Sequence, residues 1–151
     1  MIAVIQRVSA ASVAVDGQTV GKCGQGLCVL LGVAKGDARE DADALVRKIL
    51  NLRIFSDDAG KMNLSVVDIK GEMLVISNFT LLAAYKKGNR PDYMGAAAPD
   101  EANELYEYFV DCCACFVPTE KGIFGADMKV DIANDGPVTI VMDSRVLLGK
   151  T

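Results

Sequence analysis

The stretch MKVDIANDGPVTIVMD, residues 128–143, contains two strand-like runs joined by Asn134-Asp135-Gly136-Pro137. Apolar and polar residues alternate in residues 128–133 and again in residues 138–143, so one face of each run is expected to lie against a core. Proline cannot donate to a sheet ladder, and glycine accepts φ values that other residues refuse. We therefore expect the backbone to leave the sheet at Gly136-Pro137, where carbonyl groups then lack strand partners. An ordinary turn at a strand end is the alternative, because Gly-Pro is common in loops.

Four further runs upstream of this stretch have the composition of strands. Residues 2–15 and 18–24 are β-rich and are separated by Asp16-Gly17, which predicts a tight hairpin turn. Residues 26–34 are apolar almost throughout, which is typical of a strand buried on both faces. Residues 72–82 predict another strong strand. The chain is therefore expected to be rich in β-structure.

Two segments have helical periodicity. Asp37 and Glu40 have the spacing of an N-cap and its N3 acid, and apolar residues then repeat at helical spacing to about residue 51. Residues 100–116 predict a second, amphipathic helix. Its apolar stripe consists of Leu105, Tyr106, Phe109, Val110 and Cys113. We expect an α+β fold with a mostly antiparallel, barrel-like sheet and two main helices, formed as a single domain over residues 1–151.

The composition excludes several classes of active site. The chain has no histidine, which removes Ser-His-Asp and Cys-His pairs, histidine bases and the usual zinc sites. Cys112, Cys113 and Cys115 would diverge around one helix, so we expect core packing, no metal and no cofactor. Five cysteines without disulfide spacing, and no apolar run long enough for a membrane span, predict a cytoplasmic protein with no membrane partner. The net charge of −4 limits any nucleic-acid contact to a local patch.

Such a patch occurs in residues 85–99, a long loop that contains glycine and proline. It holds Lys86, Lys87 and Arg90, the one dense basic cluster in an acidic chain, with Tyr85 and Tyr93 beside it. Cations interleaved with aromatic rings suit a single-stranded nucleic-acid end, through phosphate contacts and base stacking. The alternative interpretation is an ordinary solvated loop.

Polar residues interrupt the predicted strand at Ser77-Asn78-Phe79-Thr80-Leu81. Period-two geometry would place Asn78 and Thr80 on one face, so that an amide and a hydroxyl project together where Val or Ile would be expected. Buried polar groups need partners. The pair therefore has either a structural hydrogen-bonding role or a role in a functional site.

Six blocks of this chain resemble, in order and spacing, the D-aminoacyl-tRNA deacylase family. They are residues 3–8 (AVIQRV), 48–55 (KILNLRIF), 60–63 (GKMN), 77–81 (SNFTL), 124–128 (FGADM) and 134–139 (NDGPVT). One difference lies in the fourth block, where the family usually has Ser-Gln-x-Thr-Leu and this chain has Asn78 at the glutamine position. Asparagine keeps the amide but is one methylene shorter, so a hydrogen bond from this position would be lost, bridged by water or restored by a backbone shift.

The resemblance implies a homodimer that hydrolyses the ester joining a D-amino acid, or glycine, to the 3′ end of tRNA. It further implies that Gly136-Pro137, with a cis peptide bond, enters the active site of the opposite subunit, where its carbonyl groups face the α-amino group of the substrate. L-residues would then be rejected by steric clash with the main chain, whatever their side chain. Arg7 would brace this cross-subunit loop.

The resemblance places the catalytic residues at Ser77, Asn78, Phe79 and Thr80. Because there is no histidine, the 2′-hydroxyl of the terminal adenosine would help to activate water, and backbone N–H groups near Phe79 and Thr80 would stabilise the oxyanion. The remaining assignments place substrate and RNA. Phe124, Gly125, Ala126 and Met128 would line an adenosine pocket, and Lys86, Lys87 and Arg90 would hold phosphates.

Three alternatives stay open at this point. Thr80 could be a nucleophile, although no activating base is evident and we favour a positioning role. The protein could bind the tRNA 3′ end without hydrolysing it, which the Asn78 substitution invites. It could also be a related editor of small L-aminoacyl-tRNAs, which would have a trans Gly136-Pro137 bond.

Overall fold

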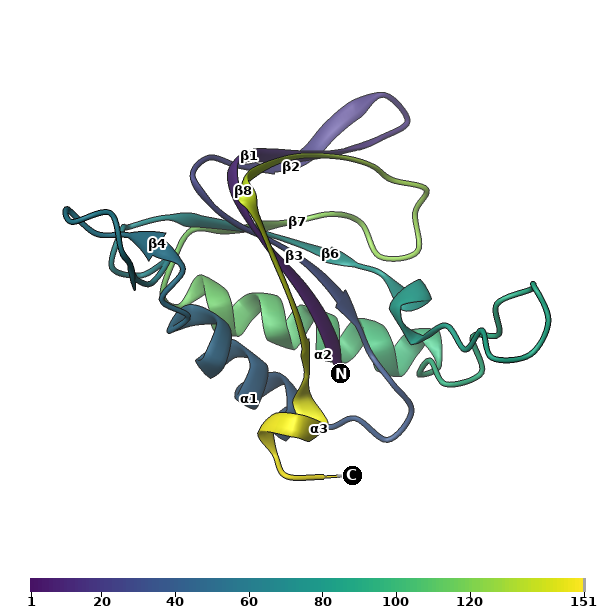
Figure 1. Ribbon diagram of the computed structural model, residues 1–151. Coiled ribbons are helices and arrows are strands. Elements are labelled where there is room, and N and C mark those ends of the chain that lie inside the picture. Colours follow the sequence, from purple (N-terminus) through teal and green to yellow (C-terminus); the bar gives the residue numbers. More distant parts are fainter. Residues whose placement is uncertain (151) are drawn as a thin grey trace.

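The computed structural model describes residues 1–150, in which a curled sheet is covered on one face by helices (Figure 1). The strands are β1 (Ile2–Val15), β2 (Gln18–Cys23), β3 (Gly26–Gly32), β4 (Phe55–Ser56), β5 (Met62–Leu64), β6 (Glu72–Ser77), β7 (Thr119–Lys121) and β8 (Lys129–Asp143). The helices are α1 (Arg39–Leu50), the 3₁₀ helix η1 (Phe79–Leu82), α2 (Pro99–Ala114) and α3 (Ser144–Leu147). None of these helices is long and apolar enough to cross a membrane.

The sheet curls because β1 is long enough to pair with two different strands along one edge. Its residues 2–8 pair with β3 and its residues 11–15 pair with β2, both antiparallel. From β3 the sheet continues through β6 to β7 by parallel pairing. The backbone N–H of Lys22 in β2 donates to Glu120 in β7 at 2.9 Å, which brings the two ends together. The predicted barrel-like sheet is confirmed, with two parallel pairs among mostly antiparallel ones.

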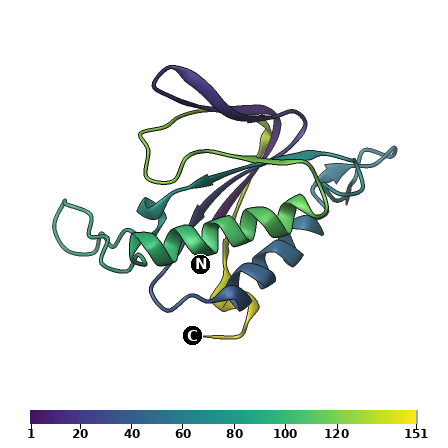
Figure 2. The same cartoon turned by 180° about the vertical axis from the view of Figure 1, so that it is seen from behind.

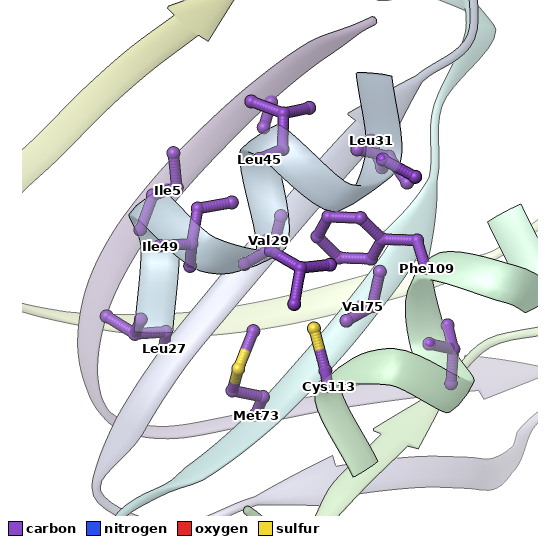
Figure 3. Close-up of a cluster of buried hydrophobic side chains, with 14 of the residues drawn as sticks. Ile5, Leu27, Val29, Leu31, Leu45, Ile49, Met73, Val75, Phe109 and Cys113 are labelled. Atoms are coloured by element: carbon purple, nitrogen blue, oxygen red, sulfur yellow. The ribbon is translucent and has the colours of Figure 1, made fainter. Parts of the chain in front are cut away.

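Strands β3 and β6, in the middle of the sheet, are buried on both faces, which the continuous apolar run predicts for β3. Side chains 27, 29 and 31 of β3 pack toward α1 and α2, together with residues 73 and 75 of β6 (Figure 3). The intervening Cys28, Leu74 and Ile76 enter the barrel interior with Val8 and Val13. Alternation of side chains along a strand therefore supplies two cores from one run of sequence.

Helices α1 and α2 lie on the same face of the sheet (Figure 2). The predicted stripe of α2 is confirmed, because all five of its residues are buried. The predicted cap of α1 is wrong. Ala38 is the N-cap residue and Asp41 reaches back to its N–H at 2.9 Å, while Asp37 instead accepts from the N–H of Ala34 at 2.7 Å.

Asp41 belongs to a buried polar network beneath α1. Its carboxylate accepts from the hydroxyl of Ser144 at 2.7 Å, and that hydroxyl accepts from the terminal amino group of Met1 at 2.9 Å. Burial raises the pKa of Asp41, but hydrogen bonds from Ala38 and Ser144 and the nearby ammonium group together hold it below its ordinary value. The charged carboxylate therefore stabilises the fold at neutral pH.

We expect Asp41→Ala to lower the free energy of unfolding at pH 7 by about 2 to 3 kcal/mol, because a buried hydroxyl and a part-buried backbone N–H lose their charged acceptor. A lowered folded-state pKa means that this contribution is complete above the ordinary carboxyl pKa and is lost as the pH falls below it. Urea titrations at pH 7 and at about pH 3 would measure both effects. Glu40→Ala, at an exposed position, is the control and should change stability by less than about 0.5 kcal/mol. Equal losses in the two variants would contradict the prediction.

Candidate active site

A cavity of about 980 Å³ opens where the carboxyl ends of the parallel strands β3 and β6 meet the first turns of α2. Its floor is the packed interior of the barrel, formed by Leu30, Ile76 and the start of β8. Its walls are residues 77–80, residues 93, 94 and 96–98, and residues 124–128. All of the predicted catalytic and adenosine-pocket residues therefore lie around one space. They are Ser77, Asn78, Phe79, Thr80, Phe124, Gly125, Ala126 and Met128.

The segment predicted to be catalytic, residues 77–80, is a turn and not the strand that residues 72–82 predict. The N–H of Asn78 still bonds the carbonyl oxygen of Leu31 at 2.8 Å, after which the chain enters η1 and the N–H of Leu81 donates to the Asn78 carbonyl at 3.3 Å. Gly32 on β3 permits this turn, since an added Cβ there would lie 3.0 Å from the Asn78 carbonyl oxygen. The predicted alternation of faces beyond Ser77 is therefore wrong.

Asn78 and Thr80 nevertheless project together. The hydroxyl of Thr80 donates to the Oδ1 atom of Asn78 at 2.6 Å. Both residues line the cavity, with Asn78 half-buried and Thr80 exposed, so these polar groups are not in the core. The turn thus presents its polar groups to the cavity.

Phe124 forms an aromatic wall that is anchored from behind. Its ring lies 6.1 Å from the ring of Tyr106, which is buried in α2. The Tyr106 hydroxyl in turn donates to the carbonyl oxygen of Val75 in β6 at 2.8 Å. Tyr106 therefore fixes the Phe124 ring relative to β6, the strand that leads into the turn at residues 77–80.

Lys35, Met94 and residues 96–98 line the cavity without having been predicted to, and Tyr93 lines it although it was expected only beside the basic cluster. Tyr93 packs edge-on against Phe79, with ring centroids 5.1 Å apart. Lys35 is held by its N–H, which donates to Gly95 at 2.9 Å, and its side chain has no carboxylate within 4.0 Å among residues 1–150. Lys35 follows β3, and the turn at residues 77–80 follows β6. Because these two strands are parallel, both segments lie at the same edge of the sheet, so knowledge of the strand pairing would have predicted that they meet.

The predicted phosphate-binding residues Lys86, Lys87 and Arg90 do not line the cavity. They lie in the exposed loop between η1 and α2, which extends away from the body of the molecule (Figure 1). The other end of the same loop supplies Tyr93 and Met94 to the cavity wall. A strand of RNA that leaves the cavity past Tyr93 would therefore pass along this loop.

The Gly136-Pro137 segment interrupts the pairing of β8 with β1, although β8 is one strand and not two. The register passes from Gln6–Thr139 to Val8–Asn134 and skips residues 135–138. The Gly136-Pro137 bond is cis, as the resemblance implies, and Gly136 has φ of 146°. The expected departure from the sheet is therefore confirmed.

Arg7, on β1, holds the skipped segment from the same chain. Its Nε donates to the carbonyl oxygen of Asp135 at 2.8 Å, and one terminal nitrogen donates to Ile54 at 2.7 Å. Gly136 and Pro137 are exposed. None of Arg7, Gly136 and Pro137 lines the cavity of this chain. Within one chain, the Gly-Pro segment therefore lies outside the cavity that residues 77–80 line.

The described residues offer no thiolate or metal centre near the cavity. Burial raises the pKa of Cys23 to about 11 and that of Cys28 to about 12, so both thiols stay protonated at neutral pH. The expected core packing holds for Cys113 on α2, which is buried, but is wrong for Cys115, which follows the last turn of α2 and is exposed. Residues 1–150 contain no group of three or more Cys, Asp or Glu side chains arranged to hold a metal ion. The groups available in the cavity are backbone N–H groups, hydroxyls, an amide, a lysine and the exposed carboxylate of Asp127.

Comparison with known proteins agrees with this fold. A solved structure described as a probable eukaryotic D-amino acid tRNA deacylase has a TM-score of 0.79 at 17% identity, over 94% of this chain and 98% of that one, which shows a shared fold. A solved c-Myc DNA unwinding element binding protein is 44% identical with a TM-score of 0.89, over 95% of this chain and 98% of that one. A D-aminoacyl-tRNA deacylase of Persephonella marina (strain DSM 14350 / EX-H1) is 57% identical over 147 residues, 97% of this chain and 100% of the relative.

The family model described as D-Tyr-tRNA(Tyr) deacylase matches residues 4–143. The fold and the cavity thus define a small α+β domain with a site at the open end of a curled sheet. The chain belongs to the D-Tyr-tRNA(Tyr) deacylase family.

Proposed function

We propose that this protein hydrolyses the ester bond of D-aminoacyl-tRNA, and of glycine mischarged on tRNA, to free amino acid and tRNA. Family membership supports the reaction class. The observation that carries the assignment is the single cavity that brings residues 77–80 and 124–128 together. The whole chain acts as one domain, and its place of work is the cytoplasm, where charged tRNA is used.

The cavity suits catalysis that the RNA itself assists. Water attacks the ester carbonyl carbon, the bond to the ribose oxygen breaks, and that oxygen leaves as the hydroxyl of tRNA. In this proposal the neighbouring 2′-hydroxyl of the terminal adenosine helps to activate the water, since the chain contains no histidine. The N–H groups of Phe79 and Thr80 stabilise the oxyanion, and each such donor contributes roughly 3 kcal/mol.

The cavity also suits a composite site in a homodimer. In this proposal the exposed Gly136-Pro137 segment reaches the cavity of a second copy, where its carbonyl groups face the ammonium group of the substrate. Arg7 supports such a role because it holds the segment at Asp135 without covering Gly136 or Pro137. Discrimination between D- and L-residues then depends on main-chain atoms that are the same for every side chain.

A deacylation assay with D-Tyr-tRNA, Gly-tRNA and L-Tyr-tRNA tests the proposed activity. Rapid release of D-tyrosine and glycine, with L-Tyr-tRNA left intact, is the expected result. Binding of all three RNAs without release would identify a tRNA-end-binding protein instead. Release of small L-amino acids, but not of D-tyrosine, would identify an editor of a different specificity.

The basic loop gives a separate prediction about RNA binding. We expect the triple variant Lys86→Gln, Lys87→Gln and Arg90→Gln to raise KM for charged tRNA about tenfold with kcat nearly unchanged. Each cation that neutralises a phosphate of a single strand contributes about 0.7 to the slope of log affinity against log salt, so the slope should fall by about 2. Initial rates at several salt concentrations measure both quantities.

The matched control removes three exposed cations elsewhere, at Arg47, Lys48 and Lys70. Its net charge change equals that of the loop variant, so general electrostatic attraction falls by the same amount. We expect the control to change KM by less than about twofold. Equal effects of the two triple variants would show that the loop has no specific contact with RNA.

A further inference from the structure

The side chain of Asn78 makes an unusual hydrogen bond for its position. Asn78 directly precedes η1, where an asparagine oxygen ordinarily accepts from the N–H two or three residues later. No such bond forms here, because Oδ1 accepts instead from the Thr80 hydroxyl at 2.6 Å. The hydroxyl has therefore replaced the backbone as the partner of this amide.

This arrangement leaves the backbone donors of the turn available. Among residues 1–150 neither the N–H of Phe79 nor that of Thr80 has a hydrogen-bond partner, whereas the N–H groups of Asn78 and Leu81 are both bonded. Both residues line the cavity. Donors that reach a substrate must be free in this way before the substrate binds.

The length of the Asn78 side chain allows its amide oxygen to compete for the backbone N–H groups of the turn. An asparagine oxygen can bond the backbone N–H two residues on in its own turn, and this conformation is common. A glutamine oxygen lies one methylene further out and does not form that short ring as readily. In this chain the amide is therefore a competitor for the same N–H groups that the reaction uses.

We propose that the Thr80 hydroxyl is a positioning group that holds the Asn78 amide away from the backbone N–H of residue 80. The inference rests on the proposed function, because the free N–H groups act only when an oxyanion forms in the cavity. The hydroxyl neither attacks the ester nor transfers a proton, since its own proton is engaged by Asn78. Its removal lets the amide turn back and cap the donors.

The test compares Thr80→Val in three backgrounds. Valine keeps the shape of threonine but lacks the hydroxyl, so with Asn78 present we expect kcat for D-Tyr-tRNA to fall by about 10- to 100-fold, with KM changed by less than about threefold. In the Asn78→Ala and Asn78→Gln backgrounds the same substitution should cost less than about fivefold, because no short amide remains to cap the turn. Thr19→Val, on exposed β2, is the matched control and should have no effect.

A readout that does not depend on activity separates this inference from the proposed function. Amide proton exchange at residue 80, followed by NMR, should slow in Thr80→Val and return to the parent rate when Asn78→Ala is added. If the parent protein releases no D-tyrosine, the proposed function is wrong, and the exchange rates still report on the amide. Losses of kcat that are equal in all three backgrounds would show that the hydroxyl acts directly on the substrate. Full activity of Thr80→Val, with unchanged exchange at residue 80, would overturn the inference.

Discussion

We expect Gly136→Ala to lose at least about 100-fold in kcat/KM for D-aminoacyl-tRNA while the protein stays folded. Gly136 has φ of 146°, which side-chain-bearing residues rarely adopt. An added Cβ would lie 2.8 Å from the backbone nitrogen of Val138 and 3.3 Å from a guanidinium nitrogen of Arg7. The segment must therefore shift, and it carries the carbonyl groups that in our proposal face the substrate. Deacylation rates and the circular dichroism spectrum measure the two parts of this prediction.

Gly17→Ala separates the effect of backbone strain from the effect of displacement. Gly17 also has a positive φ, of 79°, but an added Cβ there meets no atom within 4 Å. We expect it to lower the free energy of unfolding by about 1 kcal/mol and to leave deacylation unchanged. If Gly136→Ala behaves in the same way as Gly17→Ala, the Gly-Pro segment has no part in the reaction.

Mixed dimers would show whether the Gly136-Pro137 segment completes the active site of the other subunit. Ala126 lines the cavity, so Ala126→Trp should block it while leaving the Gly-Pro segment intact. In a composite site, a refolded one-to-one mixture of Gly136→Ala and Ala126→Trp would recover about a quarter of the parent activity, because half of the dimers have one complete site. A site formed within one chain would recover none. A monomeric protein would also contradict the proposal.

Segments that obey a single period could be predicted from the sequence. The continuous apolar run of β3 predicted two buried faces, and the helical stripe of α2 is buried at every predicted position. In both cases the pattern reports burial directly. The cap of α1 could not be predicted in this way. Asp37 and Asp41 can both accept a backbone N–H group, and in the structure Asp37 accepts from Ala34 while Asp41 accepts from Ala38.

The site was predicted where it depends on local sequence and missed where it depends on strand pairing. The residues 77–80 and 124–128 were identified, although the turn at Asn78 was read as strand because Phe79, Leu81 and Leu82 continue an apolar pattern. Lys35 reaches the cavity because β3 and β6 are parallel neighbours, and residues 96–98 lie there because the N–H of Ala97 donates to the carbonyl oxygen of Val33 just after β3. Strand composition does not reveal whether two strands run parallel, so this contribution had no local signal.

The second large effect is expected from substitution of Phe124, because a base of the substrate would stack on its aromatic ring. Stacking of a base on an aromatic ring contributes about 1 to 3 kcal/mol, so we expect Phe124→Ala to raise KM for D-aminoacyl-tRNA by roughly 5- to 150-fold. The ring packs against Tyr106, and part of its loss will therefore appear as lower stability. Phe124→Leu keeps most of the apolar volume and should restore stability but not KM. Urea titration and steady-state kinetics on both variants separate the two contributions.

Phe116→Ala is the matched control, because this ring is 65% exposed and lies outside the cavity. Its removal should leave KM within about twofold of the parent value, since no base contacts it in our proposal. A D-aminoacyl ester of adenosine alone should show the same dependence on Phe124 as charged tRNA does, because the base and not the RNA backbone occupies this wall. Normal KM in Phe124→Leu with both substrates would place the adenosine elsewhere, and the walls left for it would be those formed by Tyr93 and Lys35.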